Sequence, residues 1–388
     1  MRDGENLTGR YALIMGLYWA NYAVISSFAS MYLLDRGFSN TSIGIMMAVA
    51  ALFASIFQPV IGAYADKPQS PSVKIILMVV IGAFMISSVC IIVTSSRLPM
   101  AMVVFYAVSL MLLQSMNPLC NSLGIMSEQN GKRVNFGVAR GTGSITFAVL
   151  SIVAGKAVAV YGSGPVPWAA IAIYVLMGIA LLAFPFKKPT VTAGITKRGS
   201  FIKRYPSFLI VIVAAVFIYA GHCLLNNFIY QITVQKGGDS SSMGIALAIA
   251  AFLEIPTMFL FSKMLRIFDS GKWIVISGIA FTIKAVAALL APNVMGFYLA
   301  QLFQVFAYPV LTVASVYFIS DIVELEDTAK GQALFTMAVT IGNVVASAIG
   351  GRIIDQMGVN VMMEVTVALS AVGAVVMWIG VKSSRRRA

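Results

Sequence analysis

One carboxylic acid in the sequence lies in the middle of a long apolar run. Glu254 stands in Leu253-Glu254-Ile255-Pro256, about fourteen residues into a run that begins near residue 240. An ionised carboxylate at the centre of a bilayer costs at least ~2.5–3.5 kcal/mol on insertion scales. We therefore expect Glu254 to be protonated or paired, which makes it a candidate proton carrier. The alternative is a neutral acid that only hydrogen-bonds a neighbouring helix.

Arg140 is the candidate cation. It follows Asn135-Phe136-Gly137-Val138-Ala139, and small residues also occupy positions 141 and 143. Small side chains let another helix approach closely, and a guanidinium can hydrogen-bond two oxygens at once. Arg140 could therefore bind substrate hydroxyls, a substrate carboxylate or a protein carboxylate. The alternative is a side chain that extends to the cytoplasmic head groups.

His222, the only histidine, begins a polar stripe. Asn226 and Tyr230 follow at i+4 and i+8, on the same helical face, and Asn227 lies beside them. Histidine titrates near neutral pH, so His222 could share proton coupling with Glu254. The alternative is a neutral histidine that hydrogen-bonds within an apolar helix.

Further polar side chains recur at helical spacing in other apolar runs. These stripes are Tyr18, Asn21 and Tyr22; Gln114, Asn117 and Asn121; Gln301, Gln304 and Tyr308; and Gln332, Thr336, Thr340 and Asn343. Amides that faced lipid would stay unsatisfied, so the stripes must face protein or water. Many amides and few charges suit a neutral, hydroxyl-bearing ligand. Tyr18, Trp19, Tyr22 and Phe147 could add apolar faces, although each aromatic alone is more often a packing residue.

The elements that position these residues are membrane-spanning helices. Hydrophobic residues make up 59% of the 388 residues and charged residues 11%, far from the values of soluble domains. A helix needs about 20 apolar residues to cross a bilayer. The pattern predicts twelve spans, at about 11–34, 41–66, 73–96, 98–126, 135–161, 166–185, 205–236, 240–267, 271–291, 293–323, 327–358 and 359–382.

The net charge of +13 is unevenly distributed along these spans. With the N-terminus inside, the inner segments hold 20 of the 27 basic residues and the outer loops three. This asymmetry predicts a multi-pass protein of the inner (cell) membrane with both termini in the cytoplasm. The basic excess therefore sets orientation and contacts anionic lipid, and nucleic acid is not an expected partner.

A polar segment divides the chain near its midpoint. We expect a six-helix bundle over residues 1–186, a cytoplasmic loop over 187–204 and a second six-helix bundle over 205–388. Gly44 and Ala48 recur as Gly244 and Ala248, an offset of 200 residues, which favours a duplicated transporter fold. The prediction is an all-α membrane protein of two pseudo-symmetric six-helix bundles.

Motifs of catalysis and of nucleotide binding are missing from the sequence. It contains no phosphate-binding glycine loop, no HExxH, no Cys/His cluster and no serine elbow. We therefore expect no enzyme activity, no metal and no cofactor other than a proton as coupling ion. Asp66 and Lys67 close the second span at the cytoplasmic surface. They could gate that side by pairing with a basic residue or a helix N-terminus across the interface.

With these residues in view, the sequence resembles the major facilitator superfamily, and most closely its lactose permease-like proton symporters. The resemblance is carried by Phe57-Gln58-Pro59-x-x-Gly62-x-x-x-Asp66-Lys67 and by Asn135-Phe136-Gly137-x-Ala139-Arg140. It implies that Arg140 contacts the substrate, and Phe147 falls where that group has a stacking tryptophan.

The sequence also departs from that group. Its sugar-binding glutamate falls at Ser122, and its lysine, histidine and coupling glutamate of the tenth helix fall at Gln301, Gln304 and Ala307. Glu254 lies about one turn from the permease's acidic position in the eighth helix. The pattern also resembles nucleoside and aromatic-acid symporters, and the helix 5 signature of drug/proton antiporters is missing.

The sequence thus predicts a monomeric transporter that takes up a small polar solute, such as a sugar or nucleoside, by proton symport and alternating access. A small carboxylate or another polar metabolite also fits. An uncoupled facilitator, an exporter and a non-transporting membrane sensor are the alternatives. Proton flux on adding substrate would distinguish the first two from a symporter.

Overall fold

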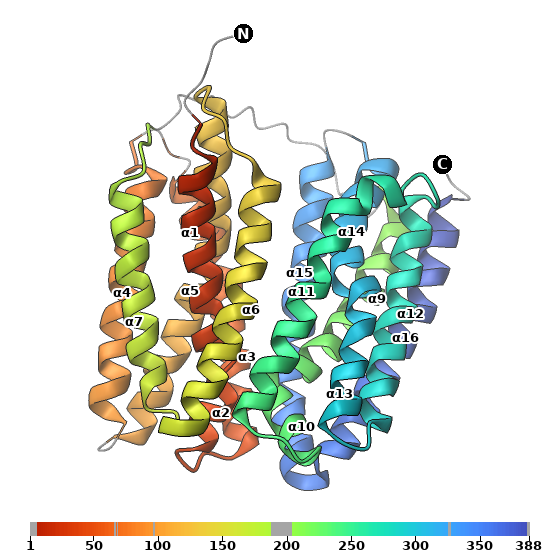
Figure 1. The fold of residues 1–388 in the computed structure, drawn as a ribbon. Helices are drawn as coiled ribbons and strands as arrows, with labels where there is room; N and C mark the ends of the chain where they lie inside the picture. Colours follow the sequence, from red (N-terminus) through yellow and green to blue (C-terminus); the bar gives the residue numbers. More distant parts are fainter. Residues whose placement is uncertain are drawn as a thin grey trace. The chain divides into compact units, whose positions relative to one another are not determined.

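A computed structural model describes residues 6–65, 67, 69–95, 98–187, 204–324 and 327–385. Within these ranges the chain is almost entirely helical (Figure 1), and twelve helices are long and apolar enough to cross a membrane. They agree with the predicted spans to within a few residues at most ends, and the all-α membrane fold class is confirmed.

The first six spans contain these elements: α1 (Thr8–Asn21), the π-helix η1 (Tyr22–Ser26), α2 (Ala29–Leu34), α3 (Asn40–Ala65), α4 (Val73–Thr94), α5 (Pro99–Gln129), α6 (Phe136–Tyr161) and α7 (Pro165–Leu182). The last six contain α9 (Pro206–Asn227), α10 (Ile229–Gln235), α11 (Ser240–Met264), α12 (Ser270–Leu290), α13 (Val294–Gln301), the 3₁₀-helix η2 (Leu302–Phe306), α14 (Tyr308–Ile322), α15 (Thr328–Met357) and α16 (Val359–Arg385).

Short polar side chains begin several of these helices. Asn135 accepts a hydrogen bond from the Val138 backbone N–H, and Asp269 does the same for the N–H of Lys272. Such caps satisfy backbone donors that have no partner within the helix. Asp239 caps α11 through the N–H of Ser242, and this hydrogen bond lowers the pKa of the Asp239 carboxyl group.

The chain divides into two compact units. One unit consists of Met1–Gly37 and Val49–Gly194, and the other of Phe38–Ala48 and Ile195–Ala388. The predicted loop over 187–204 lies mostly outside the described residues, and the predicted domain boundaries stay a prediction.

In the second unit the first turns of α3 pack against α15. The Asp355 carboxylate accepts hydrogen bonds from the backbone N–H groups of Asn40 (3.1 Å) and Thr41 (2.7 Å), and from both of their side chains. Gly351 lies so close to the Asn40 carbonyl that a methyl group there would overlap it. The glycine therefore permits backbone contact, and Asp355 caps α3 from another helix.

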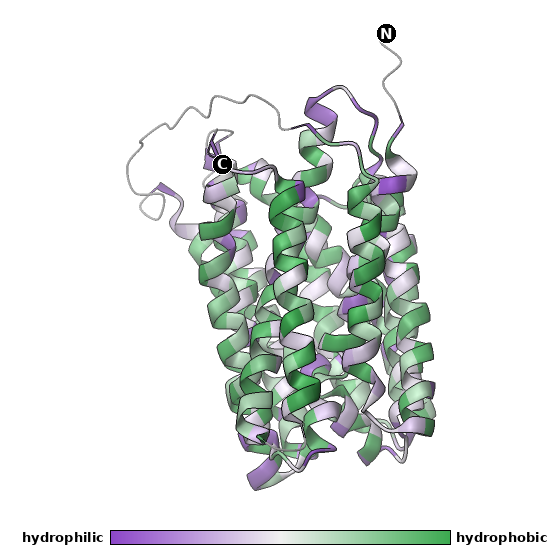
Figure 2. Ribbon diagram, turned by 90° about the vertical axis from the view of Figure 1, so that its left-hand side faces the viewer, coloured by the Kyte–Doolittle hydropathy of each residue, from purple (hydrophilic) through white to green (hydrophobic). Residues whose placement is uncertain are grey.

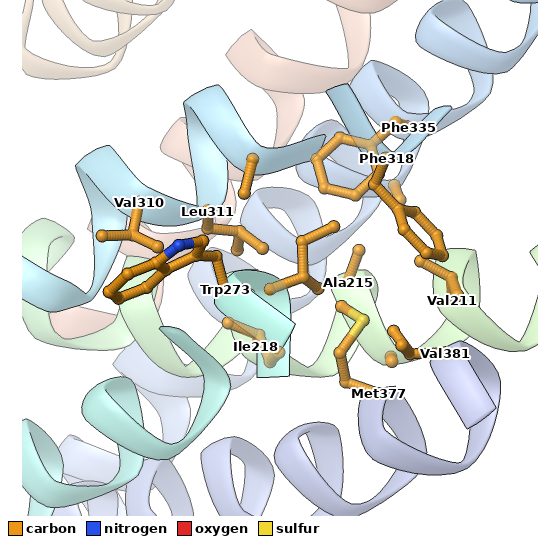
Figure 3. Close-up of a cluster of buried hydrophobic side chains, with 14 of the residues drawn as sticks. Val211, Ala215, Ile218, Trp273, Val310, Leu311, Phe318, Phe335, Met377 and Val381 are labelled. Atoms are coloured by element: carbon orange, nitrogen blue, oxygen red, sulfur yellow. The ribbon is translucent and has the colours of Figure 1, made fainter. Parts of the chain in front are cut away.

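A buried apolar cluster holds the second unit together (Figure 3). Ala215 and Ile218 of α9, Trp273 of α12, Leu311 of α14 and Met377 of α16 are all nearly inaccessible to solvent. The Trp273 indole N–H donates to the Met264 carbonyl at 2.9 Å, so its polar atom is satisfied within the core. Figure 2 shows that the residues of these helices are mostly hydrophobic along their length, as a bilayer requires.

Candidate functional site

An aromatic cluster in the first unit surrounds Trp19 of α1. The centroid of its ring lies 5.3 Å from that of Tyr18, 5.3 Å from that of Tyr22 and 6.5 Å from that of Phe147 on α6. Tyr18 is fully buried, whereas the other three side chains are partly exposed. The cluster therefore offers flat apolar faces with polar edges, which suit stacking on a sugar or a base.

Arg140 of α6 lies against this cluster. Its guanidinium carbon is 4.2 Å from the centroid of the Trp19 ring, a cation–π distance at which Arg and Trp attract by about 0.5–1 kcal/mol or more. The side chain is half-buried. The aromatic ring thus orients the guanidinium fork, and Trp19 is the ring that also neighbours Tyr22 and Phe147.

The indole N–H of Trp19 is buried and has no hydrogen-bond partner among the described residues. Gly143 on α6 allows the ring to sit there, because a methyl group at position 143 would overlap the Trp19 Cδ1 atom. A buried donor without an acceptor costs about 1–3 kcal/mol. Trp19 therefore brings a hydrogen-bond donor beside Arg140 that a bound oxygen or nitrogen could satisfy.

A π-helical turn positions the end of this cluster. The π-helix η1 begins at Tyr22, directly after α1, and the Tyr106 hydroxyl donates to the Ile25 carbonyl at 2.7 Å. A π-turn inside a helix shifts the facing of the residues that follow and occurs often at functional sites. In water, a solvent molecule would hydrogen-bond a free carbonyl of such an irregular turn. Inside a membrane the Tyr106 hydroxyl supplies that hydrogen bond.

The predicted amide ligands of the first unit differ in their surroundings. Asn21 is fully buried and donates to the Ala170 carbonyl on α7 at 3.2 Å, so it joins α1 to α7. Gln114 is half-buried on α5. Asn121 is exposed and donates to the side chain of Asn117, one turn earlier, at 3.3 Å. Asn117 and Asn121 thus form a polar surface on α5, while Asn21 has a packing contact.

The second unit contains a chain of three polar side chains from three helices. Lys284 of α12 donates from Nζ to Gln304 Oε1 at 2.7 Å, and Gln304 Nε2 donates to Glu254 Oε1 at 2.9 Å. Lys284 and Gln304 are buried, with 2% and 3% of their surfaces exposed, and Glu254 is half-buried. Lysine can only donate and a carboxylate only accept, so the amide between them has one possible orientation.

Gln304 lies in a break of the tenth span. There α13 ends at Gln301, the 3₁₀-helix η2 follows, and α14 starts at Tyr308. Two carbonyls at the break receive side-chain hydrogen bonds, from Ser277 to Ala307 (2.7 Å) and from Thr257 to Val305 (2.8 Å). Broken helices carry the binding sites of many transporters, and here neighbouring helices supply the donors.

His222 of α9 lies among aromatic rings. It is stacked on Tyr308 at 5.1 Å between centroids and meets Phe281 edge to face at 5.2 Å. Asn226 donates to the His222 backbone carbonyl at 2.9 Å. The predicted pair of His222 and Asn226 is therefore in contact, and Tyr308 connects His222 to the break that contains Gln304.

A second amide cluster joins α9 to α15. Asn227 donates to Asn343 at 2.9 Å and to the Ser347 hydroxyl at 2.8 Å. Tyr230 is half-buried on α10, and Gln301 is buried at the end of α13. Asn227 and Asn343, which the sequence places in two separate stripes, thus meet between two helices.

The predicted gate is described only in part. Asp66 lies outside the described residues, and Lys67 is exposed just after α3. Among the described residues, no cluster of three or more His, Cys, Asp or Glu could hold a metal ion.

Comparison with known proteins relates this geometry to a family. The model of the MFS_1 like family matches residues 10–365. The chain belongs to the MFS_1 like family. A comparison with curated proteins gives no match.

Solved structures with this fold include the nucleoside transporter NupG, at 15% sequence identity and a TM-score of 0.79, covering 98% of this chain and 99% of that one. A point mutant of the same transporter gives 16% identity and a TM-score of 0.78, covering 98% and 100%. A bacterial homologue of the human lysosomal transporter Spinster, in an inward-facing and unoccupied conformation, gives 16% identity and a TM-score of 0.68, covering 97% and 96%.

The sequence prediction omits Lys284, and it gives Trp19 only as an apolar face, without its contact with Arg140. Lys284 is a lysine in the middle of an apolar span, so the rule that selects Glu254 also selects it. Trp19 stands between the predicted residues Tyr18 and Tyr22, and its contact with Arg140 depends on how α1 packs against α6. The functional roles of all the predicted site residues stay predictions.

Proposed function

We propose that the protein is a secondary active transporter that takes up a small polar solute, such as a sugar or nucleoside, together with a proton. The observation that carries the proposal is the chain from Lys284 through Gln304 to Glu254. It places the single mid-span carboxylic acid in hydrogen-bond contact with an amide that also holds a buried cation.

The proton acts through the charge of this chain. When Glu254 is ionised, its charge attracts Lys284 and the amide of Gln304 is held at both ends. Protonation removes that attraction, so the contacts of Gln304 on the broken tenth span weaken. The membrane potential contributes about 2.3 kcal/mol per charge per 100 mV. That amount changes a binding equilibrium tens-fold.

The solute class follows from the aromatic cluster in the first unit. Arg140 supplies a forked donor, Trp19 supplies an N–H without a partner among the described residues, and Tyr22 and Phe147 add ring faces. This set suits a neutral ligand with a flat ring and several hydroxyl groups. The fold shared with a nucleoside transporter makes nucleosides the first solutes to test.

Alternating access completes the proposal. Protonation of Glu254 from the outside permits solute binding, and loss of the proton on the inner side favours release. We expect the transporter to act as a monomer in the inner (cell) membrane, with both termini in the cytoplasm. The proton is its coupling ion, and it needs no metal or other cofactor.

Proteoliposomes test this function. The purified protein is reconstituted with an inwardly directed pH gradient, and uptake of labelled nucleosides and sugars is measured together with the internal pH. The proposal expects one solute to accumulate and to acidify the lumen. Uptake without acidification would instead indicate an uncoupled facilitator.

Glu254→Gln tests the coupling residue. We expect the variant to exchange solute across the membrane but to lose accumulation driven by the pH gradient. Glu364→Gln is the matched control, because Glu364 is an exposed carboxylate on another spanning helix, α16. If Glu254→Gln still accumulates solute with a normal pH dependence, this coupling mechanism is wrong. If no solute is bound or transported, the sensor alternative is favoured.

A further inference from the structure

A groove on the surface of the second unit lies between α12 and α16. The two helices pack side by side (Figure 1), and the space between them near the start of α12 and the end of α16 has a volume of about 530 Å³. Val275 and Ile276 of α12 and Val381 of α16 form its apolar lining. The transport proposal uses none of these residues.

Two lysines stand at the groove, each over an aromatic ring. Lys272 Nζ lies 5.6 Å from the centroid of Phe268, and Lys382 Nζ lies 5.1 Å from that of Trp378. Both lysines and both rings are exposed, Trp378 by 53% of its surface. Aromatic rings beside basic side chains are typical of the interface between hydrocarbon and head groups. The groove is thus apolar with cations at one end.

The charge of this end is balanced only in part by a neighbouring acid. Asp269 Oδ2 lies 3.6 Å from Lys272 Nζ, a longer contact than a charge-assisted hydrogen bond of about 2.7–2.9 Å. Its other oxygen, Oδ1, caps α12 through the Lys272 backbone N–H. The three side chains Lys272, Lys382 and Asp269 therefore leave one net positive charge beside the groove.

The apolar lining continues along both helices. Ile279 and Ile283 extend it on α12, at 49% and 43% exposure, and Val375 and Ile379 extend it on α16, at 57% and 45%. Steps of three and four residues place these side chains on the same helical faces as the groove residues. In a membrane protein such a face contacts acyl chains, so the groove opens onto the hydrocarbon.

We propose that this groove binds one anionic glycerophospholipid. Its phosphate lies between Lys272 and Lys382, and one acyl chain lies along the groove and continues over the apolar faces of α12 and α16. Charge complementarity selects the occupant: one phosphodiester balances the net positive charge, and the apolar lining of Val275, Ile276 and Val381 suits an acyl chain, which a soluble anion lacks. Basic pockets between spanning helices on the cytoplasmic side bind anionic head groups in this way.

Quenching of Trp378 fluorescence tests the proposal directly. The purified protein is placed in phosphatidylcholine nanodiscs that contain either phosphatidylglycerol or phosphatidylcholine with brominated acyl chains. At equal content, we expect brominated phosphatidylglycerol to quench Trp378 fluorescence more strongly than brominated phosphatidylcholine. Trp378→Phe should remove the difference, because Trp19, Trp168 and Trp273 lie outside the groove.

Lysine variants distinguish a defined lipid-binding site from general electrostatic attraction between basic residues and anionic lipid. Lys272→Gln with Lys382→Gln should weaken the preference for phosphatidylglycerol roughly tenfold. Lys263→Gln with Arg266→Gln removes the same charge at the end of α11, outside the residues that line the groove, and should leave the preference nearly unchanged. An equal loss in both pairs, or no preference in the unaltered protein, would overturn the proposal.

A bulky side chain tests the acyl-chain part. Ile276→Trp fills the groove and keeps both lysines, so we expect the preference for phosphatidylglycerol to fall while thermal unfolding stays close to that of the parent. If a folded Ile276→Trp protein kept its full preference for phosphatidylglycerol, the proposed position of the acyl chain in the groove would be wrong. If added inorganic phosphate abolished the preference for phosphatidylglycerol, the site would bind a free anion instead of a lipid.

Discussion

The indole of Trp19 holds Arg140 in place and at the same time leaves its own N–H without a partner among the described residues. A buried donor of this kind is a cost that folding alone does not explain. Beside a guanidinium and two further rings, it has the chemistry to hydrogen-bond a solute. The N–H and the ring face are separable by substitution.

Trp19→Phe removes the N–H and keeps an aromatic face. We expect the solute concentration for half-maximal uptake to rise about 2- to 10-fold, since one net hydrogen bond contributes about 0.5–1.5 kcal/mol. The temperature of thermal unfolding should be unchanged or slightly higher. Trp168→Phe, at an indole 61% exposed on α7, is the control in the same uptake assay. An unchanged half-maximal concentration would show that Trp19 only supports Arg140.

Lys284 and Glu254 interact through a neutral amide, so their energies should not be additive. Lys284→Met leaves a carboxylate in the span without its cation, whereas Lys284→Met with Glu254→Gln removes both charges. We expect the single lysine variant to unfold at a lower temperature than the double variant, with a coupling of about 1–3 kcal/mol.

The exposed pair Lys272 and Asp269 gives the control for this cycle. Measured in detergent without anionic lipid, Lys272→Met and Asp269→Asn should couple by less than about 1 kcal/mol. Asn keeps the capping oxygen, so the control does not disturb the start of α12. Additive effects at Lys284 and Glu254 would mean that Gln304 does not transmit charge between them.

At the scale of the element, the break in the tenth span depends on donors from other helices. The Ser277 hydroxyl satisfies the Ala307 carbonyl at 2.7 Å, and both groups are buried. Ser277→Ala should therefore lower the free energy of unfolding by about 1–3 kcal/mol. Thermal unfolding in detergent measures this loss.

Ser88→Ala is the matched control. The Ser88 hydroxyl is fully buried on α4 but has no partner among the described residues, so its removal should leave the free energy of unfolding unchanged or raise it by up to about 1–3 kcal/mol. Equal losses for Ser277→Ala and Ser88→Ala would show that the carbonyl at the break does not need its donor.

The sequence predicts the spans but not their irregular turns. Apolar runs of about 20 residues are dictated by bilayer thickness, so the ends of α4 and α12 can be predicted to within two residues. The π-turn at Tyr22–Ser26 and the 3₁₀-turn at Leu302–Phe306 depend instead on Tyr106, Ser277 and Thr257. These donors are remote in the chain, and no local propensity predicts them.

The same limit applies to the site. Glu254 and Arg140 stand out in the sequence because charge is rare in apolar spans, and Lys284 meets the same criterion. That Gln304 lies between Lys284 and Glu254 follows only from the packing of three helices. Composition therefore selects chemically active residues, and tertiary packing decides which of them interact.

For the whole molecule, the distribution of basic residues predicts the orientation in the membrane. The inner segments are expected to carry 20 of 27 and the outer loops three. With this predicted orientation, Lys272 and Lys382, and hence the proposed lipid site, are expected in the inner leaflet. The orientation is testable independently of any transported solute, because the protein has only three cysteines, all within helices.

Single cysteines introduced after replacing Cys90, Cys120 and Cys223 with alanine report the sidedness of the loops. Met357→Cys lies at the exposed end of α15, on the expected outer side, and Lys187→Cys is exposed after α7, on the expected inner side. A membrane-impermeant maleimide added to intact cells should label Met357→Cys alone, and permeabilised cells should show both labels. The two positions are separated by an odd number of spans, so they must react oppositely whichever way the chain is inserted. Labelling of Lys187→Cys in intact cells would therefore show that the chain is inverted against its charge bias, and would move the lysine-lined groove to the outer leaflet.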